Sequence, residues 1–153
     1  MSNWYIQIDE QGNPVNHPML EENLIDIYPN GIPKKYQPFM RIPTPIPNVF
    51  QMVGDAPSYE KINDIWQDVW PLIQKSTEEV AGIKAQIDQI ILNIKTERVA
   101  KVNGLIADNS TTEAQKIAYN NYLAQLRIYT VTDYLNWEVP KIPKLDLNGN
   151  IIS

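Results

Sequence analysis

Proline placement constrains the fold of this chain more than any other feature. Ten of the twelve prolines lie at or before Pro71, the other two are Pro140 and Pro143, and residues 72–139 contain none. Proline lacks an amide hydrogen and clashes with the preceding turn of a helix, so long helices belong in the proline-free stretch. We therefore predict strands, turns and extended chain in residues 1–71, followed by helices.

The first 71 residues have the pattern of a small antiparallel β lobe. Residues 4–8 indicate a strand that ends at a turn over residues 9–13, and the further strand candidates are residues 49–53, 59–62 and 65–70, which with a turn at Asn63-Asp64 would form a meander. Residues 16–24 predict a short helix, because Pro18 stands near its start and acids follow, with Leu20, Leu24 and Ile27 on one face. Four prolines interrupt residues 36–48, which we expect to be an extended edge.

Two capping patterns predict helices in the proline-free stretch. Ser76-Thr77-Glu78-Glu79 and Ser110-Thr111-Thr112-Glu113 each place a serine three residues before a glutamate, as in a capping box. The first helix carries isoleucines at alternating spacings of four and three residues and should end at Gly104 or at Asp108-Asn109, and the second should run to about Arg127. We therefore predict a helical hairpin over residues 76–128.

These patterns together predict an α+β fold in three parts. The parts are a proline- and aromatic-rich acidic β lobe over residues 1–73, the helical hairpin over residues 76–128, and an extended C-terminal tail over residues 129–153. Within the tail, residues 145–152 are expected to form a strand, a turn and a strand. The formal net charge of −5 arises entirely in residues 1–71, where nine acids stand against four bases.

Composition argues against most catalytic chemistries. The chain has no cysteine, which excludes disulfides, thiol catalysis and thiolate zinc sites, and its single histidine, His17, excludes metal sites built on two imidazoles. His17 is then the one candidate general base, but no serine or aspartate stands at a spacing that implies a triad. The acid pairs Glu21-Glu22 and Glu78-Glu79 are better explained as helix starts. A carboxylate-dependent hydrolase using Asp9, Glu21 and Glu22 is the remaining enzymatic alternative, and we predict that the protein is not an enzyme.

Binding of small ligands, nucleic acid or membrane is not predicted either. Asp146, Asn148 and Asn150 alternate as calcium ligands do, but Gly149 is misplaced for a calcium loop and no closing glutamate follows. The glycines form no phosphate-binding loop, so no cofactor is expected. The net negative charge disfavours nucleic acid, and no apolar run approaches the roughly 20 residues that cross a bilayer.

A seam of isoleucines on the first predicted helix is the strongest candidate for an interface. Isoleucine at both seam positions favours trimers or higher assemblies if the seam is intermolecular, whereas packing of the second helix on the same stripe would bury it within one chain. We favour the intramolecular packing. For the aromatic residues near Trp66 and Tyr122 we likewise favour packing within the fold over a ligand-binding platform. The full set of candidate interface residues is Ile83, Ile87, Ile90, Ile94, Tyr122, Leu126 and Trp137.

Several short stretches resemble accessory proteins of tailed bacteriophages. Those that look like marine cyanophage proteins are Asn3-Trp4-Tyr5, His17-Pro18, Glu21-Glu22-Asn23-Leu24, Tyr28-Pro29 and Pro38-Phe39-Met40-Arg41. Tyr119, Tyr122-Leu123-Ala124-Gln125-Leu126-Arg127 and Trp137-Glu138-Val139-Pro140 are similar to the phage tail assembly chaperone family, in which an aromatic-rich helix ending in Leu-Arg precedes a Trp-Pro segment.

The resemblance implies a protein that works by binding and assembly. The function expected from it is that of a structural component of a phage particle, in the tail, baseplate or fibre region, made in the host cytoplasm and retained in the virion. Its partners would be other phage structural proteins. The alternative is a tail-fibre assembly chaperone that is not retained in the mature virion.

Overall fold

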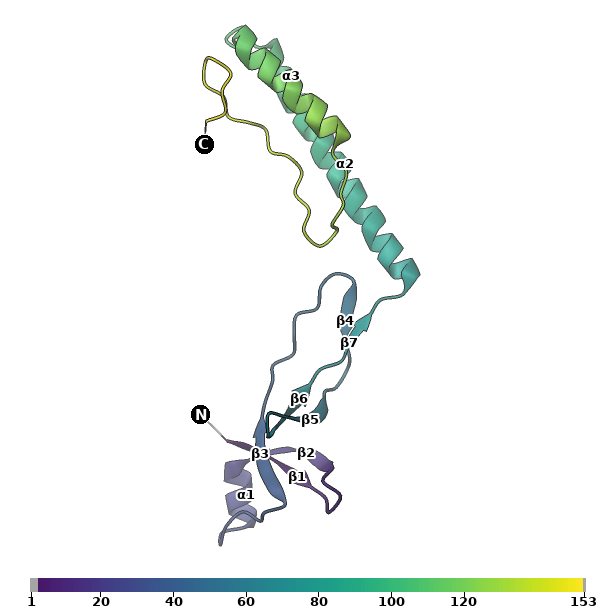
Figure 1. Cartoon of the computed structure of the whole chain (residues 1–153), viewed down its shortest axis with the longest axis vertical. Coiled ribbons are helices and arrows are strands. Elements are labelled where there is room, and N and C mark those ends of the chain that lie inside the picture. Colours follow the sequence, from purple (N-terminus) through teal and green to yellow (C-terminus); the bar gives the residue numbers. More distant parts are fainter. Residues whose placement is uncertain (1–2, 153) are drawn as a thin grey trace. The chain divides into compact units, whose positions relative to one another are not determined.

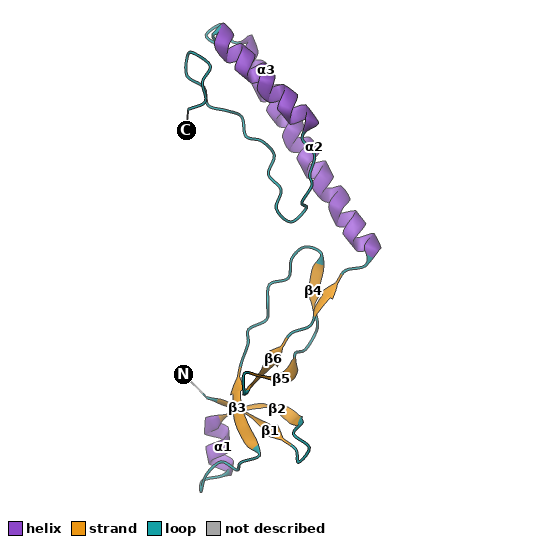
Figure 2. Ribbon diagram, in the orientation of Figure 1, coloured by secondary structure: helices purple, strands orange, loops and turns teal. Residues whose placement is uncertain are grey.

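The computed structural model describes residues 3–152 and contains two compact units, of which the first ends at Lys75 and the second begins at Ser76. Figure 1 follows the chain through both units, and Figure 2 shows strands in the first unit and two long helices in the second. The predicted α+β class is therefore confirmed. Residues 129–152, which the sequence sets apart as a tail, belong to the second unit.

Five strands of the first unit form a mixed sheet. They are β1 (Trp4–Ile8), β2 (Pro14–Leu20), β3 (Tyr36–Met40), β5 (Ser58–Ile62) and β6 (Ile65–Val69), in the order β2-β1-β3-β6-β5. Neighbouring strands are antiparallel except β3 and β6, which pair in parallel at Phe39–Trp66 and Met40–Gln67. The predicted all-antiparallel lobe is wrong on this point. Parallel neighbours need a long connection, and residues 41–64 supply it.

Both turns predicted within this sheet are present. The turn over residues 9–13 joins β1 to β2, and Gly12 in that turn has a φ of 86°. Asn63 and Asp64 join β5 to β6 with φ values of 50° and 64°. Two consecutive positive φ angles define the turn whose twist suits a two-residue hairpin, and asparagine and aspartate tolerate them better than most side chains.

A small hydrophobic core forms on one face of the sheet. Ile6, Ile8, Phe39 and Trp66 are buried there, and Trp4 and Tyr59 pack against them. Ile6 and Ile8 are two residues apart, so the alternation of a strand places both on the same face. The Trp66 indole nitrogen donates a hydrogen bond of 2.9 Å to the side-chain oxygen of Gln37, which satisfies the polar atom of a buried ring.

The short helix begins later than predicted. Residues 14–20 form the edge strand β2, and the helix α1 (Glu21–Ile27) follows directly, with Leu24 fully buried and Ile27 exposed. An edge strand accepts prolines, because one row of its amides has no partner, and β2 contains Pro14 and Pro18. Asn16 adopts a φ of 66° at the irregularity in the pairing of β2 with β1. Pro18 therefore belongs to a strand and does not start the helix.

The proline-rich segment after residue 35 also departs from the prediction. Tyr36–Met40 is the central strand β3, whereas residues 41–48 are loop. Pro38 is compatible with this position because the ladder to β6 begins at Phe39, one residue later. The predicted meander is present only in part. β5 and β6 pair as expected, but β4 (Gln51–Val53) pairs with β7 (Leu72–Gln74) in a separate two-stranded sheet, which we call the β4–β7 ribbon (Figure 1).

The second unit is built on two capped helices. α2 (Thr77–Ala107) begins with the predicted capping box of Ser76 and Glu79. It continues through Gly104 and ends at Ala107, with Asp108 as its C-cap. α3 (Glu113–Ile128) has Thr112 as its N-cap, two residues after the predicted cap Ser110. There the Thr112 hydroxyl accepts from the Gln115 amide and the Gln115 side chain accepts from the Thr112 amide, at 3.2 and 2.9 Å.

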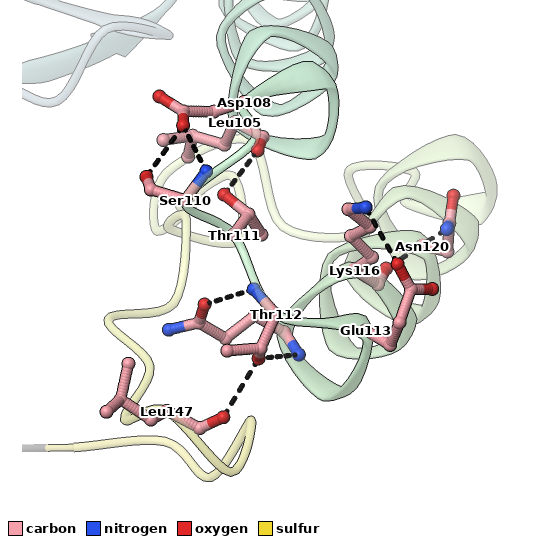
Figure 3. A network of polar contacts seen from close by, with 10 residues as sticks. Leu105, Asp108, Ser110, Thr111, Thr112, Glu113, Lys116, Asn120 and Leu147 are labelled. Atoms are coloured by element: carbon pink, nitrogen blue, oxygen red, sulfur yellow. Dashed lines mark hydrogen bonds and ion pairs between the residues drawn. The ribbon is translucent and has the colours of Figure 1, made fainter.

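The predicted cap residue Ser110 has a different role (Figure 3). Its amide and hydroxyl both donate to the Asp108 carboxylate, and these hydrogen bonds lower the pKa of Asp108. The predicted partner Glu113 pairs with Lys116 at 2.8 Å. The Thr112 hydroxyl also donates to the carbonyl oxygen of Leu147, which ties the C-terminal segment to the start of α3.

Residues 129–152 pack along the two helices without forming a regular element. The guanidinium of Arg98 on α2 donates to the carbonyl oxygens of Val139, at 2.6 Å, and Pro140. The hydroxyl of Tyr122 on α3 donates to the same Pro140 oxygen at 2.8 Å. The tail ends in a small hairpin with one bridge, between Leu145 and Ile151. It is extended, as predicted, and it completes the core of the second unit.

Candidate protein-interaction surfaces

The predicted isoleucine seam lies mostly inside the second unit. Ile87 is buried, and Ile83 and Ile94 are partly buried against the same core, whereas Ile90 is 47% exposed. Ile91 is buried in place of Ile90, which the predicted seam included. A straight α-helix repeats every 3.6 residues, so a strict heptad drifts off the buried face. Three of the four isoleucines therefore pack within the chain and are not free to form a trimer seam.

The remaining predicted interface residues are also part of this core. Tyr122 and Leu126 are buried, and Trp137 packs against them from the tail. Burial raises the pKa of the Tyr122 hydroxyl, with the nearby Arg98 acting in the opposite direction. A phenol held neutral in this way remains a hydrogen-bond donor to the tail. These aromatic side chains stabilise the second unit and leave little surface for a partner.

Exposed apolar side chains gather instead on the β4–β7 ribbon and the loop before it. Ile46 is 96% exposed, and Val49, Met52, Leu72 and Ile73 are each about half exposed. Residues 49–54 and 70–74 contain no charged side chain. Groups of exposed apolar side chains mark interaction surfaces on folded proteins. This surface was not predicted from the sequence, although the charge-free run on each strand is a signal of it.

A second group of exposed apolar residues lies in the second unit. Ile117 and Ile128 project from α3, with exposed fractions of 63% and 79%. Leu147 and Ile151 are similarly exposed in the C-terminal hairpin. None of these four residues belongs to the core cluster of this unit. Each unit therefore presents apolar side chains that its own fold leaves exposed.

An open groove on the first unit combines aromatic and charged groups. It has a volume of about 550 Å³ and is lined by residues 3–5 and 38–41. The Arg41 guanidinium lies 5.1 Å from the centre of a Trp4 ring and 3.1 Å from the buried carboxylate of Asp68. Asp68 also accepts from the Ile42 amide at 2.9 Å. The carboxylate is thus occupied by structural contacts, and it holds Arg41 over the tryptophan.

Two of the titratable residues singled out in the sequence, His17 and Glu21, have structural partners. His17 lies 2.8 Å from the Tyr59 hydroxyl, and Glu21 accepts from Asn3 and Tyr5. The proximity of Glu21 adds to burial in raising the pKa of Tyr5. Within residues 3–152, no group of three histidine, cysteine or acidic side chains is placed to hold a metal ion.

Two turns share a sequence pattern that was not among the predicted motifs. Asp9-Glu10-Gln11-Gly12-Asn13 and Asp146-Leu147-Asn148-Gly149-Asn150 both have aspartate first, glycine fourth and asparagine fifth. In each, one aspartate oxygen accepts from the third and fifth amides, and the glycine has a φ near 80°. The alternation that resembles a calcium loop therefore belongs to a hairpin turn, in which Asp146 binds amides. These hydrogen bonds, led by those from Asn150, lower the pKa of Asp146.

Comparisons with known proteins give no relative. The chain matches no protein-family model, and neither a curated protein nor a solved structure is similar enough to count as a match. Across residues 3–152, no helix combines the length and the apolar character needed to cross a bilayer.

Proposed function

We propose that this protein is a structural component of a bacteriophage particle, in the tail, baseplate or fibre region, and that it acts by protein–protein assembly. The observation that carries the proposal is the exposed apolar surface on both units, above all on the β4–β7 ribbon. Burial of apolar area drives most protein association, at about 25 cal/mol per Å². A partner that covers these side chains would gain the part of this free energy that exceeds the entropic cost of association.

Two further features support an assembly role. Three of the side chains that could serve in catalysis are engaged in structural contacts: Asp146 in a hairpin turn, Glu79 in a helix cap and His17 in a contact between strands. The second unit is a hairpin with a capping box on each helix, which makes a well-defined support for a surface. The phage assignment itself comes from the resemblance of short sequence stretches, and the particle is therefore where it must be tested.

Mass spectrometry of purified particles of the phage that encodes this chain tests the proposal. Peptides from both units should be present at a constant ratio to the other structural proteins across successive purification steps. Reproducible absence from the particles would reject a structural role. Absence from particles, together with recovery from infected-cell lysate bound to a fibre subunit, would instead identify a tail-fibre assembly chaperone.

A further inference from the structure

Hydrogen-bond alternation shows which backbone groups of the β4–β7 ribbon point outward. The Gly54 amide donates to the carbonyl oxygen of Pro71, and the Lys75 amide donates to that of Phe50, so these flanking pairs are of the hydrogen-bonded type. Such pairs alternate with non-hydrogen-bonded pairs along an antiparallel ladder. The first and third residues of each ribbon strand therefore direct their amide and carbonyl groups to the outer edges.

The outer edge of β4 is occupied, whereas that of β7 is open. The outward amide of Gln51 donates to the carbonyl oxygen of Asn48 at 3.0 Å, so a turn lies along β4. The outward amide and carbonyl groups of Leu72 and Gln74 take part in none of the hydrogen bonds formed by residues 3–152. All three residues of β7 are also exposed. An open edge of this kind can add a strand from another chain.

β7 lacks the features that protect the edges of the five-stranded sheet. There, the edge strand β2 contains two prolines, and the edge strand β5 carries Glu60 and Lys61. Proline and charge are the usual means by which proteins prevent an exposed edge from pairing with another chain. The strand Leu72–Gln74 has neither. Pro71 precedes it in an inward-facing pair, so this proline removes no donor from the outer edge.

We propose that two copies of this chain associate through the outer edge of β7, which pairs antiparallel to β7 of the second copy about a two-fold axis at Ile73. In this register Leu72 stands opposite Gln74 of the second copy, and the reverse pair forms on the other side of the axis. Both residues present outward amide and carbonyl groups, so each pair can exchange two hydrogen bonds. The result is a four-stranded antiparallel sheet with an isologous interface, which stabilises a ribbon that is marginal with two strands.

The exposed side chains of the ribbon complement one another in this register. Ile73 pairs with Met52 within each copy, so the two share one face, and their exposed fractions are 46% and 49%. At the axis the two Ile73 side chains meet between the two Met52 side chains, which makes one row of four apolar residues across the sheet. An axis at Gln74 would instead place Ile73 opposite Lys75 and break this row.

Charge also favours the antiparallel arrangement. Lys75 follows β7, and its ammonium donates to the carbonyl oxygen of Val49 in the same ribbon at 2.8 Å. A parallel pairing in register would place the two lysines side by side, and like charges directly opposite each other are destabilising. In the antiparallel pairing Lys75 stands opposite Pro71 of the second copy, at the end of that ribbon where the exposed Asp55 follows β4. Each end of the sheet then carries charges of opposite sign.

Cysteine cross-linking of the full-length chain tests the register directly, because the chain contains no cysteine. We expect Ile73→Cys to form an intermolecular disulfide rapidly under mild oxidation. The two residues at the axis form a non-hydrogen-bonded pair, whose Cα separation of about 4.5 Å lies within the range of disulfides. Met52→Cys is the matched control, since Met52 is equally exposed on the same face. Its two copies lie three strand spacings apart, about 14 Å, so it should cross-link severalfold more slowly.

A charge exchange in the full-length chain gives a second readout by sedimentation equilibrium. The double variant Leu72→Lys with Gln74→Lys puts lysines opposite each other in both pairs of the interface, whereas Leu72→Lys with Gln74→Glu puts opposite charges there. The first should weaken dimerisation about tenfold relative to the second. Dimerisation of the unmodified chain should be weak, because a three-residue edge makes a small interface.

Three results would overturn the proposal. They are a monomer at the highest soluble concentration of the unmodified chain, equal dimerisation of the two charge variants, and cross-linking of Met52→Cys as fast as Ile73→Cys. Because purified protein is used, these results are independent of the presence of the chain in a phage particle.

Discussion

Nδ1 of His17 lies 2.8 Å from the hydroxyl oxygen of Tyr59, and this contact joins the two edge strands of the five-stranded sheet. β2 and β5 stand at opposite ends of the strand order, so the sheet must curve strongly to bring them within hydrogen-bond distance. The Tyr59 ring also meets Phe39 edge-on, with 5.5 Å between ring centroids. The only histidine of the chain therefore has a structural role in holding this curvature.

Removal of this hydrogen bond should destabilise the first unit modestly. Tyr59→Phe retains the ring contact with Phe39 and loses only the hydroxyl, so we expect a loss of about 0.5–1.5 kcal/mol in the free energy of unfolding. Urea denaturation of His17→Phe, Tyr59→Phe and the double variant would measure the coupling. Effects of the two single variants that simply add would show that the side chains do not interact.

Arg98 should be the most important single contact between α2 and the C-terminal tail. Arg98→Met leaves the Val139 carbonyl oxygen without its donor, and we expect the second unit to lose about 1–3 kcal/mol of stability and residues 129–152 to become sensitive to proteases. Arg127→Met is the matched control because Arg127 is exposed on α3. Equal denaturation midpoints for the two variants would contradict this role.

The capping box of Thr112 and Gln115 should contribute more to stability than the neighbouring ion pair of Glu113 and Lys116. Thr112→Ala removes the cap of α3, so it should cost about 1 kcal/mol in thermal or urea unfolding. Gln115→Ala removes the other half of the capping box, so it should also lower the free energy of unfolding, by up to about 1 kcal/mol. Glu113→Ala removes only an exposed ion pair with Lys116, for which we expect at most about 0.5 kcal/mol. A larger effect at Glu113 than at Thr112 would favour the box expected from the sequence.

The C-terminal hairpin turn should be sensitive to acid. A lowered pKa in the folded state means that the fold favours the ionised carboxylate of Asp146, so this stabilisation is present above the ordinary value of 3.8 and is lost as the pH falls through the lower folded-state value. An NMR titration should follow the loss through the Asn150 amide, which donates to Asp146. Asn150→Ala should raise the pKa of Asp146, whereas Asn148→Ala, which keeps its backbone donor, should leave it unchanged.

Local patterns allowed much of the fold to be predicted. The strand over residues 4–8, the turn at Asn63-Asp64 and the capping box at Ser76 depend on residues close in sequence, and all are present. Errors arose where partners distant in the chain decide the outcome. Pro38 is compatible with a central strand only because β6 pairs from Phe39 onward, and Leu72 forms a strand because β4 lies beside it. Neither pairing can be inferred from local spacing.

The candidate surface was less predictable than the fold. An apolar helical seam has the same sequence pattern whether it packs against another copy or against its own chain. Ile87 is buried within the chain because residues of α3 and the tail pack in the same core. The β4–β7 ribbon was recognisable only by what it lacks, namely charge. Its three-residue strands are too short for alternation to identify their exposed faces.

We propose that this chain is built into a phage particle through its exposed apolar surfaces. The most direct measurement is the number of copies per particle after gradient purification and a high-salt wash, determined by quantitative mass spectrometry against a known structural protein. We expect a fixed number of copies that the wash does not reduce. A copy number that falls to zero with purification would contradict it.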